Sequence, residues 1–280
     1  MVSDLLVRRL LADQFPQWAD LPLKRVASSG TVNALYRLGD HLVVRLPLRP
    51  SGGADIALER TWLPRLAPLL PVPVPVPVGL GKPTDGMPAE WAVYRWLPGE
   101  HPPEGSAGAD LVSDLAGFVR AISRVSLPGA PPAYRGGSLR EQDAGTREAI
   151  AELGDRVDVR RVTAAWEEAL DTPEWSGPPV WLHADLMPGN LLVADGRLSA
   201  VIDFGTLGVG DPACDLIPAW NLLTSTTREA FRAGLDVDDA TWIRGRGKAL
   251  SMALIQLPYY WDTNPAMAAN ARYVIQEVLR

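Results

Sequence analysis

The chain is poor in the residues that build disulfide frameworks and zinc sites. Its 280 residues include one cysteine, Cys214, and three histidines, His41, His101 and His183. A single cysteine excludes an intrachain disulfide, and these few scattered side chains argue against a zinc cluster. Cys214 stands in an apolar context, which is typical of an unreactive core thiol.

Long apolar runs are also missing. No stretch approaches the ~20 apolar residues that span a bilayer. The first residues, Met-Val-Ser-Asp, lack the basic segment and apolar run of a secretory signal peptide. We therefore expect a cytoplasmic protein with no membrane partner. The net charge of -6 and the pI near 5.2 argue against a nucleic-acid partner, because nucleic-acid-binding proteins are usually basic.

Lysine is scarce as well. Three of the 27 basic residues are lysines (Lys24, Lys82 and Lys248), so 24 are arginines. This bias runs along the whole chain, so an arginine can stand at a position where a lysine would serve the same purpose.

Two common glycine-rich nucleotide motifs are absent. Gly81-Lys82 is followed by Pro83 and lacks the earlier glycine of a Walker A loop, while Gly208-x-Gly210 lacks the third glycine of a dinucleotide fingerprint. Any nucleotide site must be built in another way.

With 47% hydrophobic residues, the chain has material for one large domain or two lobes. Periodicity and turn residues predict strands first and helices later. We expect strands at 24–27, 34–38, 41–46 and 90–96, with an edge strand or polyproline II segment at 71–79. We expect helices at 4–15, 54–66, 111–125, 139–153, 159–170, 226–235, 238–257 and 265–279, and a helix that begins at Asp215 and continues through Leu223.

The most informative stretch lies between residues 180 and 216. An apolar run, 180–182, leads into His183-Ala-Asp185, and Asn190 follows five residues later, after Pro188-Gly189. Two short β-prone runs, 191–194 and 198–202, flank Asp195-Gly196, a strong hairpin signal. The second run ends at Asp203, so the chain can fold back toward Asn190 and Asp185.

Two carboxylates and a carboxamide that converge in this way suit magnesium, which prefers oxygen ligands and takes others from substrate phosphates. Asp185, placed off the metal, could accept the proton of an attacking hydroxyl, as phosphoryl transfer requires. Asp and Asn are also ordinary turn residues. The ordered set, rather than any one member, favours the catalytic interpretation.

The pattern His183-x-Asp185-x4-Asn190, followed by Ile202-Asp203-Phe204-Gly205 and by Gly210-Asp211-Pro212-x-x-Asp215-Leu216, resembles the aminoglycoside phosphotransferase family. These are small-molecule relatives of the protein kinases. The resemblance implies a two-lobed, α+β protein-kinase-like fold. Residues 1–97 would form a nucleotide-binding N-lobe with a small antiparallel sheet. Residues 98–280 would form a mainly helical C-lobe with the catalytic loop and substrate site.

The resemblance also assigns roles in the catalytic segment. Asp185 would be catalytic, Asn190 and Asp203 would hold Mg²⁺, and His183 and Asp215 would support the loop. In particular, Asp215 is expected to accept hydrogen bonds from backbone N–H groups of that loop.

The nucleotide site is assigned in the same way. The loop Ser28-Ser29-Gly30 is expected to lie against the phosphates, although it also fits an ordinary hairpin loop. Arg45 stands where kinase-like proteins present a lysine to the phosphates, and Glu59 would be its partner. The strand that carries Tyr94 leads to a hinge at which the backbone of Trp96 and Leu97 would contact the base, while the Pro/Gly-rich stretch 98–108 marks the lobe boundary.

The function implied is transfer of the γ-phosphate of ATP or GTP to a hydroxyl of a small molecule, such as an aminoglycoside or another antibiotic. A housekeeping kinase for an amino alcohol or sugar is an alternative, as is a nucleotide-binding pseudoenzyme. Five residues, 206–210, separate Gly205 from Asp211, which is too short a stretch for the phosphorylated activation segment of a protein kinase. No motif anchors the substrate-binding residues, which the sequence leaves unknown.

Overall fold

The structure is a computed structural model that describes residues 2–27 and 32–280. The chain divides into two compact units. The first comprises Met1–Pro68, Pro73–Pro98 and Val201–Gly205, and the second comprises Leu69–Val72, Gly99–Ala200 and Thr206–Arg280. The short segment Val201–Gly205 thus belongs to the first unit although its neighbours in sequence belong to the second.

The first unit is built on a five-stranded antiparallel sheet. Its strands are β1 (Leu23–Arg25), β2 (Asn33–Leu38), β3 (Leu42–Pro47), β4 (Pro77–Gly81) and β5 (Trp91–Arg95), in the order β1-β2-β3-β5-β4. The proline-rich stretch 71–79 contributes an edge strand only from Pro77 onward. Alternate prolines before it have no N–H to donate to a ladder.

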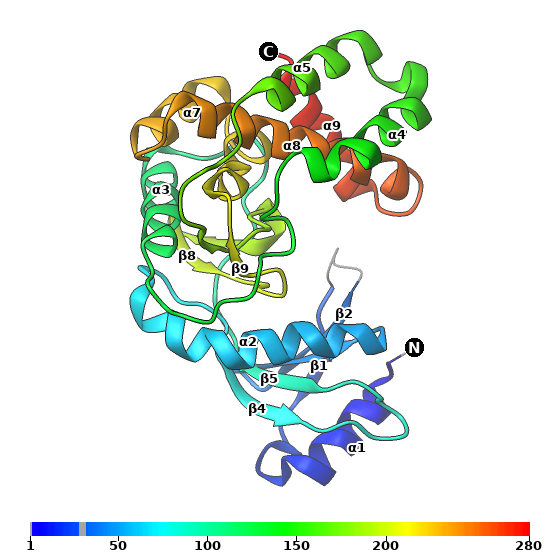
Figure 1. Cartoon of the computed structure of the whole chain (residues 1–280). Coiled ribbons are helices and arrows are strands. Elements are labelled where there is room, and N and C mark those ends of the chain that lie inside the picture. The colour runs from blue at the N-terminus through cyan, green and yellow to red at the C-terminus, as the bar shows by residue number, and fades with distance from the viewer. Residues whose placement is uncertain (1, 28–31) are drawn as a thin grey trace. The chain divides into compact units, whose positions relative to one another are not determined.

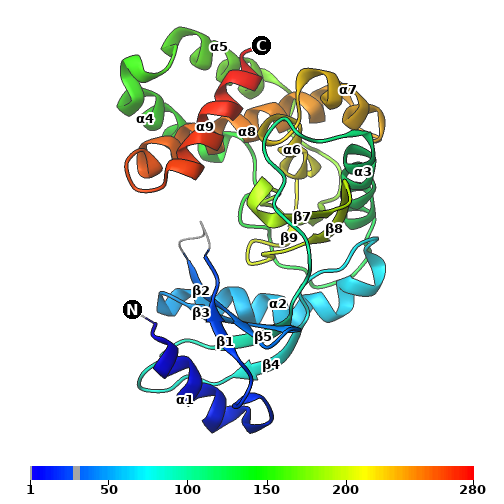
Figure 2. The same ribbon diagram turned by 180° about the vertical axis from the view of Figure 1, so that it is seen from behind.

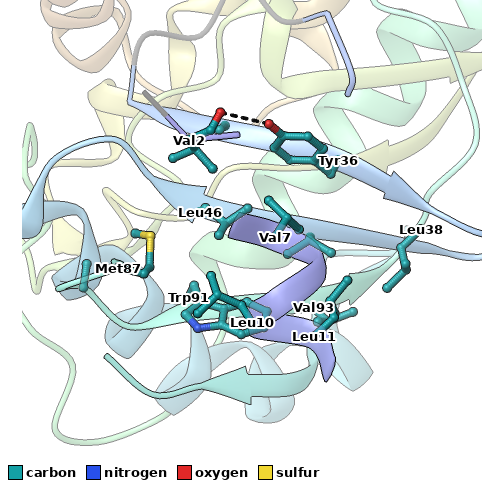
Figure 3. Close-up of a cluster of buried hydrophobic side chains, with 13 residues drawn as sticks. Val2, Val7, Leu10, Leu11, Tyr36, Leu38, Leu46, Met87, Trp91 and Val93 are labelled. Atoms are coloured by element: carbon teal, nitrogen blue, oxygen red, sulfur yellow. Dashed lines mark hydrogen bonds between the residues drawn. The ribbon is translucent and has the colours of Figure 1, made fainter. Parts of the chain in front are cut away.

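Two helices cover opposite faces of this sheet (Figure 1). Helix α1 (Asp4–Gln14) begins after Ser3, whose hydroxyl accepts the N–H of Leu6 at 3.3 Å. Its apolar stripe packs on alternate residues of the strands, and Figure 3 shows this cluster, in which the Tyr36 hydroxyl donates to the Val2 carbonyl at 3.1 Å. Burying this cluster is the main stabilisation of the α1 face.

Helix α2 (Gly53–Leu66) packs on the other face, where Ile56 contacts Ala92, Tyr94 and Val43. Strand residues alternate between faces, so Val44 and Leu46 point to α1, while Val43 and Arg45 point to α2. The pleat of β3 therefore places a cationic side chain under α2.

The second unit is mainly helical (Figure 2). Its helices are α3 (Ala109–Ser123), α4 (Asp143–Leu153), α5 (Val159–Asp171), α6 (Pro218–Asn221), α7 (Ser225–Ala233), α8 (Asp239–Tyr260) and α9 (Pro265–Val278). The long helix α8 is central, with α4, α5 and α9 packed against it. The prediction of one helix from Asp215 through Leu223 was wrong. A 3₁₀ turn, Pro212–Leu216, precedes the one-turn α6 because Pro218 has no N–H with which to continue a helix.

Two small strand pairs complete this part of the chain. Strands β7 (Leu191–Ala194) and β8 (Arg197–Val201) form the predicted hairpin, and Asp195 and Gly196 at its turn have φ of 52° and 76°. Positive φ at both positions is what a two-residue Asp-Gly turn requires. Strand β6 (Val180–Leu182) pairs antiparallel with β9 (Gly208–Gly210), which was not predicted.

Candidate active site

The predicted catalytic segment is the loop between β6 and β7, in the second unit. His183 is fully buried at its start, and Thr206 Oγ1 donates to its carbonyl at 2.9 Å. The next residue, Ala184, has φ of 66°, a left-handed conformation that costs a non-glycine residue roughly 1–2 kcal/mol. The loop is therefore held in a shape that it would not adopt alone.

Asp215 supplies that restraint. Its Oδ2 accepts the N–H of His183 at 2.7 Å and its Oδ1 accepts the N–H of Ala184 at 2.8 Å. These are the hydrogen bonds predicted from the sequence. Burial raises the pKa of Asp215, while the charge interaction with His183 and the two N–H groups act in the opposite direction.

Asn221 supports the same loop from α6. Its Nδ2 donates to the carbonyl of Leu186 at 3.0 Å and contacts Met187 Sδ at 3.4 Å. Its own carbonyl accepts from Asn270 Nδ2 at 3.0 Å. Sequence reasoning missed Asn221, because a single asparagine in an apolar stretch gives no motif. The loop is thus anchored on both sides of Asp185.

Asp185 lies at the tip of this loop with its side chain 22% exposed. Its Oδ1 accepts from Arg135 Nη1 at 2.9 Å and its Oδ2 accepts from Asn190 Nδ2 at 3.1 Å. Asn190 Nδ2 also donates to the backbone carbonyl of Asp185 at 2.8 Å. The nitrogen end of the Asn190 amide therefore faces Asp185, which leaves the Oδ1 end as the one suited to a cation.

Arg135 is the second site residue that sequence reasoning missed. It lies in the Pro/Gly-rich loop between α3 and α4, about fifty residues before Asp185, and its side chain is 24% exposed. Its backbone is held by Lys248, which is buried on α8 and donates from Nζ to the carbonyls of Arg135 at 3.0 Å and Gly137 at 2.5 Å. Burial lowers the pKa of Lys248.

A second cluster lies in the first unit, between β3, β5 and α2. Arg45, 7% exposed, donates from Nη1 to Glu59 Oε1 at 2.7 Å. Glu59, fully buried, also accepts from the Tyr94 hydroxyl at 2.6 Å and from the N–H of Phe204 at 3.0 Å. Burial raises the pKa of Tyr94, and the neighbouring Glu59 carboxylate raises it further.

Asp203 joins this cluster from the segment Val201–Gly205. Its Oδ1 accepts from Arg45 Nη2 at 3.0 Å, while its side chain is 47% exposed. Burial alone would lower the pKa of Arg45, but Glu59 and Asp203 raise it above its usual value. The guanidinium thus carries a full charge, held between two carboxylates.

The segment that carries Asp203 has a distinctive backbone. Asp203 has φ of 63°, and a Cβ built at Gly205 would lie 2.9 Å from the Cβ of Asp55 on α2. Glycine at 205 therefore permits a close approach of the two segments. Burial raises the pKa of Asp55, and Asp203 acts in the same direction, so Asp55 is a further acidic neighbour of this cluster.

The remaining nucleotide residues are only partly placed. Ser28, Ser29 and Gly30 lie outside the described residues. The N–H of Trp96 donates to the carbonyl of His41 at 2.8 Å, and Arg37 stacks on the Trp96 ring with 4.0 Å between the guanidinium carbon and the ring centroid. Trp96 therefore has its carbonyl, rather than its N–H, to offer a ligand, and Leu97 beside it is half-buried.

The structure thus brings together two sets of predicted residues. One set, in the first unit, comprises Arg45, Glu59, Tyr94 and Asp203. The other, in the second unit, comprises His183, Asp185, Asn190 and Asp215. Within residues 2–27 and 32–280, no group of three or more His, Cys, Asp or Glu forms a metal cluster. A magnesium ion that takes an amide oxygen and a carboxylate and is otherwise held by phosphates does not need such a cluster.

The amino-acid sequence matches the model of a known protein family. Residues 24–250 match the family model described as the phosphotransferase enzyme family (APH). The chain belongs to this family, which confirms the resemblance noted from the sequence.

Known proteins agree with this assignment. An aminoglycoside 3'-phosphotransferase of Escherichia coli is 26% identical over 145 residues, which is 48% of this chain and 52% of the relative. The chain therefore spans about half the length of the curated relatives that it matches.

Solved structures match over almost the whole chain. The GDP and kanamycin complex of an aminoglycoside 2''-phosphotransferase superimposes with a TM-score of 0.79, at 18% identity over 98% of both chains. The apoenzyme of a macrolide 2'-phosphotransferase from Brachybacterium faecium gives 0.65, at 23% identity over 96% of both chains. These likenesses confirm the predicted two-lobed, α+β kinase-like fold.

No helix in the described part of the chain is both long enough and apolar enough to cross a bilayer.

Proposed function

We propose that the protein transfers the γ-phosphoryl group of ATP or GTP to a hydroxyl group of a small molecule. The observation that carries this proposal is the fixed carboxylate of Asp185. Asp185 lies on a strained loop. The buried carboxylate of Asp215 accepts hydrogen bonds from the N–H groups of the two residues before Asp185, and the side-chain amide of Asn190 donates to Asp185 Oδ2. A structural loop has no evident need for a partly exposed carboxylate held so firmly.

In the proposed reaction, Asp185 accepts a hydrogen bond from the substrate hydroxyl and takes its proton as the new bond to phosphorus forms. The bond between the γ-phosphorus and the bridging oxygen breaks, and the nucleoside diphosphate leaves with the electron pair. Little covalent chemistry falls to the protein, so positioning and charge neutralisation provide most of the rate.

Asn190 Oδ1 and the Asp203 carboxylate are proposed to hold Mg²⁺, which would neutralise charge on the nucleotide phosphates when bound. Arg45 would bind phosphate oxygens and keep its orientation through Glu59. An arginine keeps the charge of the usual lysine and can bind with two parallel N–H groups. Its pairing with Glu59 favours an active enzyme over a pseudoenzyme.

The substrate class is proposed from the relatives. The family comparison and the similar structures, whose names include aminoglycoside and macrolide phosphotransferases, favour an aminoglycoside or another antibiotic, and hence a role in antibiotic resistance. We propose a cytoplasmic location because the reaction consumes a nucleoside triphosphate. A kinase for an amino alcohol or a sugar would use the same groups, and the following experiment separates these classes.

The purified protein would be incubated with magnesium and ATP or GTP, together with aminoglycosides, macrolides, amino alcohols or sugars. Diphosphate release and the mass of the product would be followed. The proposal predicts release that one substrate class stimulates, with one phosphoryl group added to the product. Nucleotide binding without turnover across the whole panel would contradict it.

A further inference from the structure

Residues 131–136 of the loop that carries Arg135 are hydrogen-bonded to β9 and to the residues that flank it. The carbonyl of Pro131 accepts the N–H of Val209 at 2.8 Å, and the N–H of Ala133 donates to the Val209 carbonyl at 3.0 Å. The N–H of Tyr134 donates to the Thr206 carbonyl at 3.2 Å. Residues 131–134 therefore run beside β9 almost as an extra strand, which is unusual for a Pro/Gly-rich connection.

Two glycines of β9 make this approach possible. A Cβ built at Gly208 would lie 2.5 Å from the backbone N of Ala133, and one built at Gly210 would lie 2.5 Å from the Cα of Gly136. Real Cβ atoms do not approach backbone atoms so closely. Gly208 and Gly210, which do not belong to a dinucleotide fingerprint, therefore allow the loop to pack closely against β9.

Lys248 on α8 holds the same loop at residues 135 and 137. Its ammonium donates to the carbonyls of Arg135 and Gly137, and the side chain is 1% exposed. A buried ammonium group is costly unless its hydrogen bonds are well made. In a chain with three lysines against 24 arginines, a lysine here is notable, because a compact ammonium can meet two carbonyls where a planar guanidinium needs more room.

The hydrogen bonds to β9, the two glycines and Lys248 together fix the backbone from which Arg135 extends. Its guanidinium meets Asp185 Oδ1 at 2.9 Å, while Asn190 occupies Oδ2 at 3.1 Å. This bond uses one of the five N–H donors of an arginine. The guanidinium consequently stands beside the carboxylate at which the acceptor hydroxyl must bind.

We propose that Arg135 is a further catalytic residue, which holds the Asp185 carboxylate and binds the phosphoryl group as it passes to the substrate hydroxyl. The inference rests on the proposed phosphotransfer. A hydroxyl within hydrogen-bond reach of Asp185 brings the phosphorus that it attacks close to the same carboxylate. An anionic carboxylate and an anionic phosphoryl group repel each other, and a fixed cation between them removes that repulsion.

The atoms balance without any further reactant. The hydroxyl oxygen forms a bond to the γ-phosphorus, the bond to the diphosphate oxygen breaks, and the proton passes to Asp185. Arg135 remains protonated throughout and donates hydrogen bonds to the phosphoryl oxygens. Because these bonds strengthen as charge develops, their loss should reduce kcat more than nucleotide affinity.

The test compares Arg135→Gln and Arg135→Lys with wild type. Arg197→Gln serves as the matched control, because Arg197 also pairs with an aspartate, Asp114, at 2.6 Å but lies on the β7–β8 hairpin. We expect Arg135→Gln to lower kcat about 100-fold or more, with little change in the KM for nucleotide or in the melting temperature. Arg135→Lys should recover part of kcat, and Arg197→Gln should match wild type.

A second measurement isolates the transition state. Affinity for ADP with aluminium fluoride, which mimics the transferring phosphoryl group, should fall in Arg135→Gln, while affinity for ADP alone should not. A kcat within about twofold of wild type, or equal losses in both affinities, would overturn the proposal. If wild type turns over no substrate, the proposed function fails and this inference fails with it. If wild type turns over a substrate and Arg135→Gln does so equally fast, only the proposed role of Arg135 fails.

Discussion

Replacing Glu59 with alanine should strongly destabilise the first unit. Glu59 is fully buried and accepts three hydrogen bonds, from Arg45 at 2.7 Å, from Tyr94 at 2.6 Å and from the N–H of Phe204 at 3.0 Å. The substitution removes the buried carboxylate partner of Arg45 and leaves Asp203, whose side chain is half-exposed, as its ion-pair partner. It also leaves a buried hydroxyl and a buried N–H without this acceptor.

The magnitude follows from those losses. Each buried donor left without an acceptor costs about 1–3 kcal/mol, and breaking a buried ion pair by removing one partner costs about 3–5 kcal/mol in total. We expect Glu59→Ala to fall in the latter range, because the two estimates describe overlapping losses. Glu59→Gln keeps the shape and one acceptor oxygen, so it should lose about 1.5–3 kcal/mol.

Urea unfolding followed by circular dichroism and tryptophan fluorescence would measure these differences. Glu90→Gln is the control, since Glu90 pairs with Arg60 at 3.9 Å at the surface of the same unit, where an ion pair is worth about 0–1 kcal/mol. A Glu59→Ala loss no larger than that of Glu90→Gln would refute the view that the cluster stabilises the unit.

Four further predictions concern the second unit. Because burial lowers the pKa of Lys248 below 10.5, the unfolded chain binds a proton more readily than the native chain just below that pH. The stability of wild type relative to Lys248→Met should therefore rise as the pH increases toward 10.5, as urea midpoints at successive pH values would show. A difference that does not change with pH would contradict a lowered pKa of Lys248. The charged neighbours of Lys248 include Asp211, Glu141 and Arg244. Burial raises the pKa of the Cys214 thiol to about 12, so a thiol reagent at neutral pH should label the protein only after unfolding, and prompt labelling of the native protein would contradict this. Asp215→Asn keeps one of two acceptor oxygens and should lose about 1–3 kcal/mol together with most of kcat, whereas retained turnover would show that the loop needs no such support. Gly210→Ala should lower the free energy of unfolding by about 1–3 kcal/mol through overpacking against Gly136. An unchanged melting temperature would mean that the 131–137 loop does not pack closely against β9.

Much of the fold could be predicted because local signals agree with the tertiary structure. The Asp195-Gly196 turn, the alternation in β3 and the helical stripe of α1 are each set by short-range chemistry. The helix predicted from Asp215 failed for an equally local reason, since Pro218 interrupts it. Strand β9 was missed because three residues with two glycines carry no strand propensity, and its pairing depends on β6 and the 131–137 loop.

The candidate site shows the same division. An ordered motif predicted Asp185, Asn190 and Asp215 as site residues, and the structure brings these three to one loop. The pairing of Arg45 with Glu59 was expected from the family resemblance. Arg135 carried no such signal, because one arginine among 24 in a loop fifty residues away is indistinguishable by sequence. Its approach to Asp185 depends on long-range contacts through β9 and α8, which no local pattern encodes.

The most direct test of the central claim is phosphoryl transfer by Asp185→Asn. Asparagine preserves the size of the side chain and can still meet Asn190, but it cannot accept the proton of the substrate hydroxyl. With a substrate that wild type phosphorylates, transfer from labelled ATP or GTP should fall by about 100-fold or more, while nucleotide affinity measured by calorimetry stays close to that of wild type. Undiminished transfer by Asp185→Asn would contradict the assignment of Asp185 as the proton acceptor, and with it the proposed mechanism.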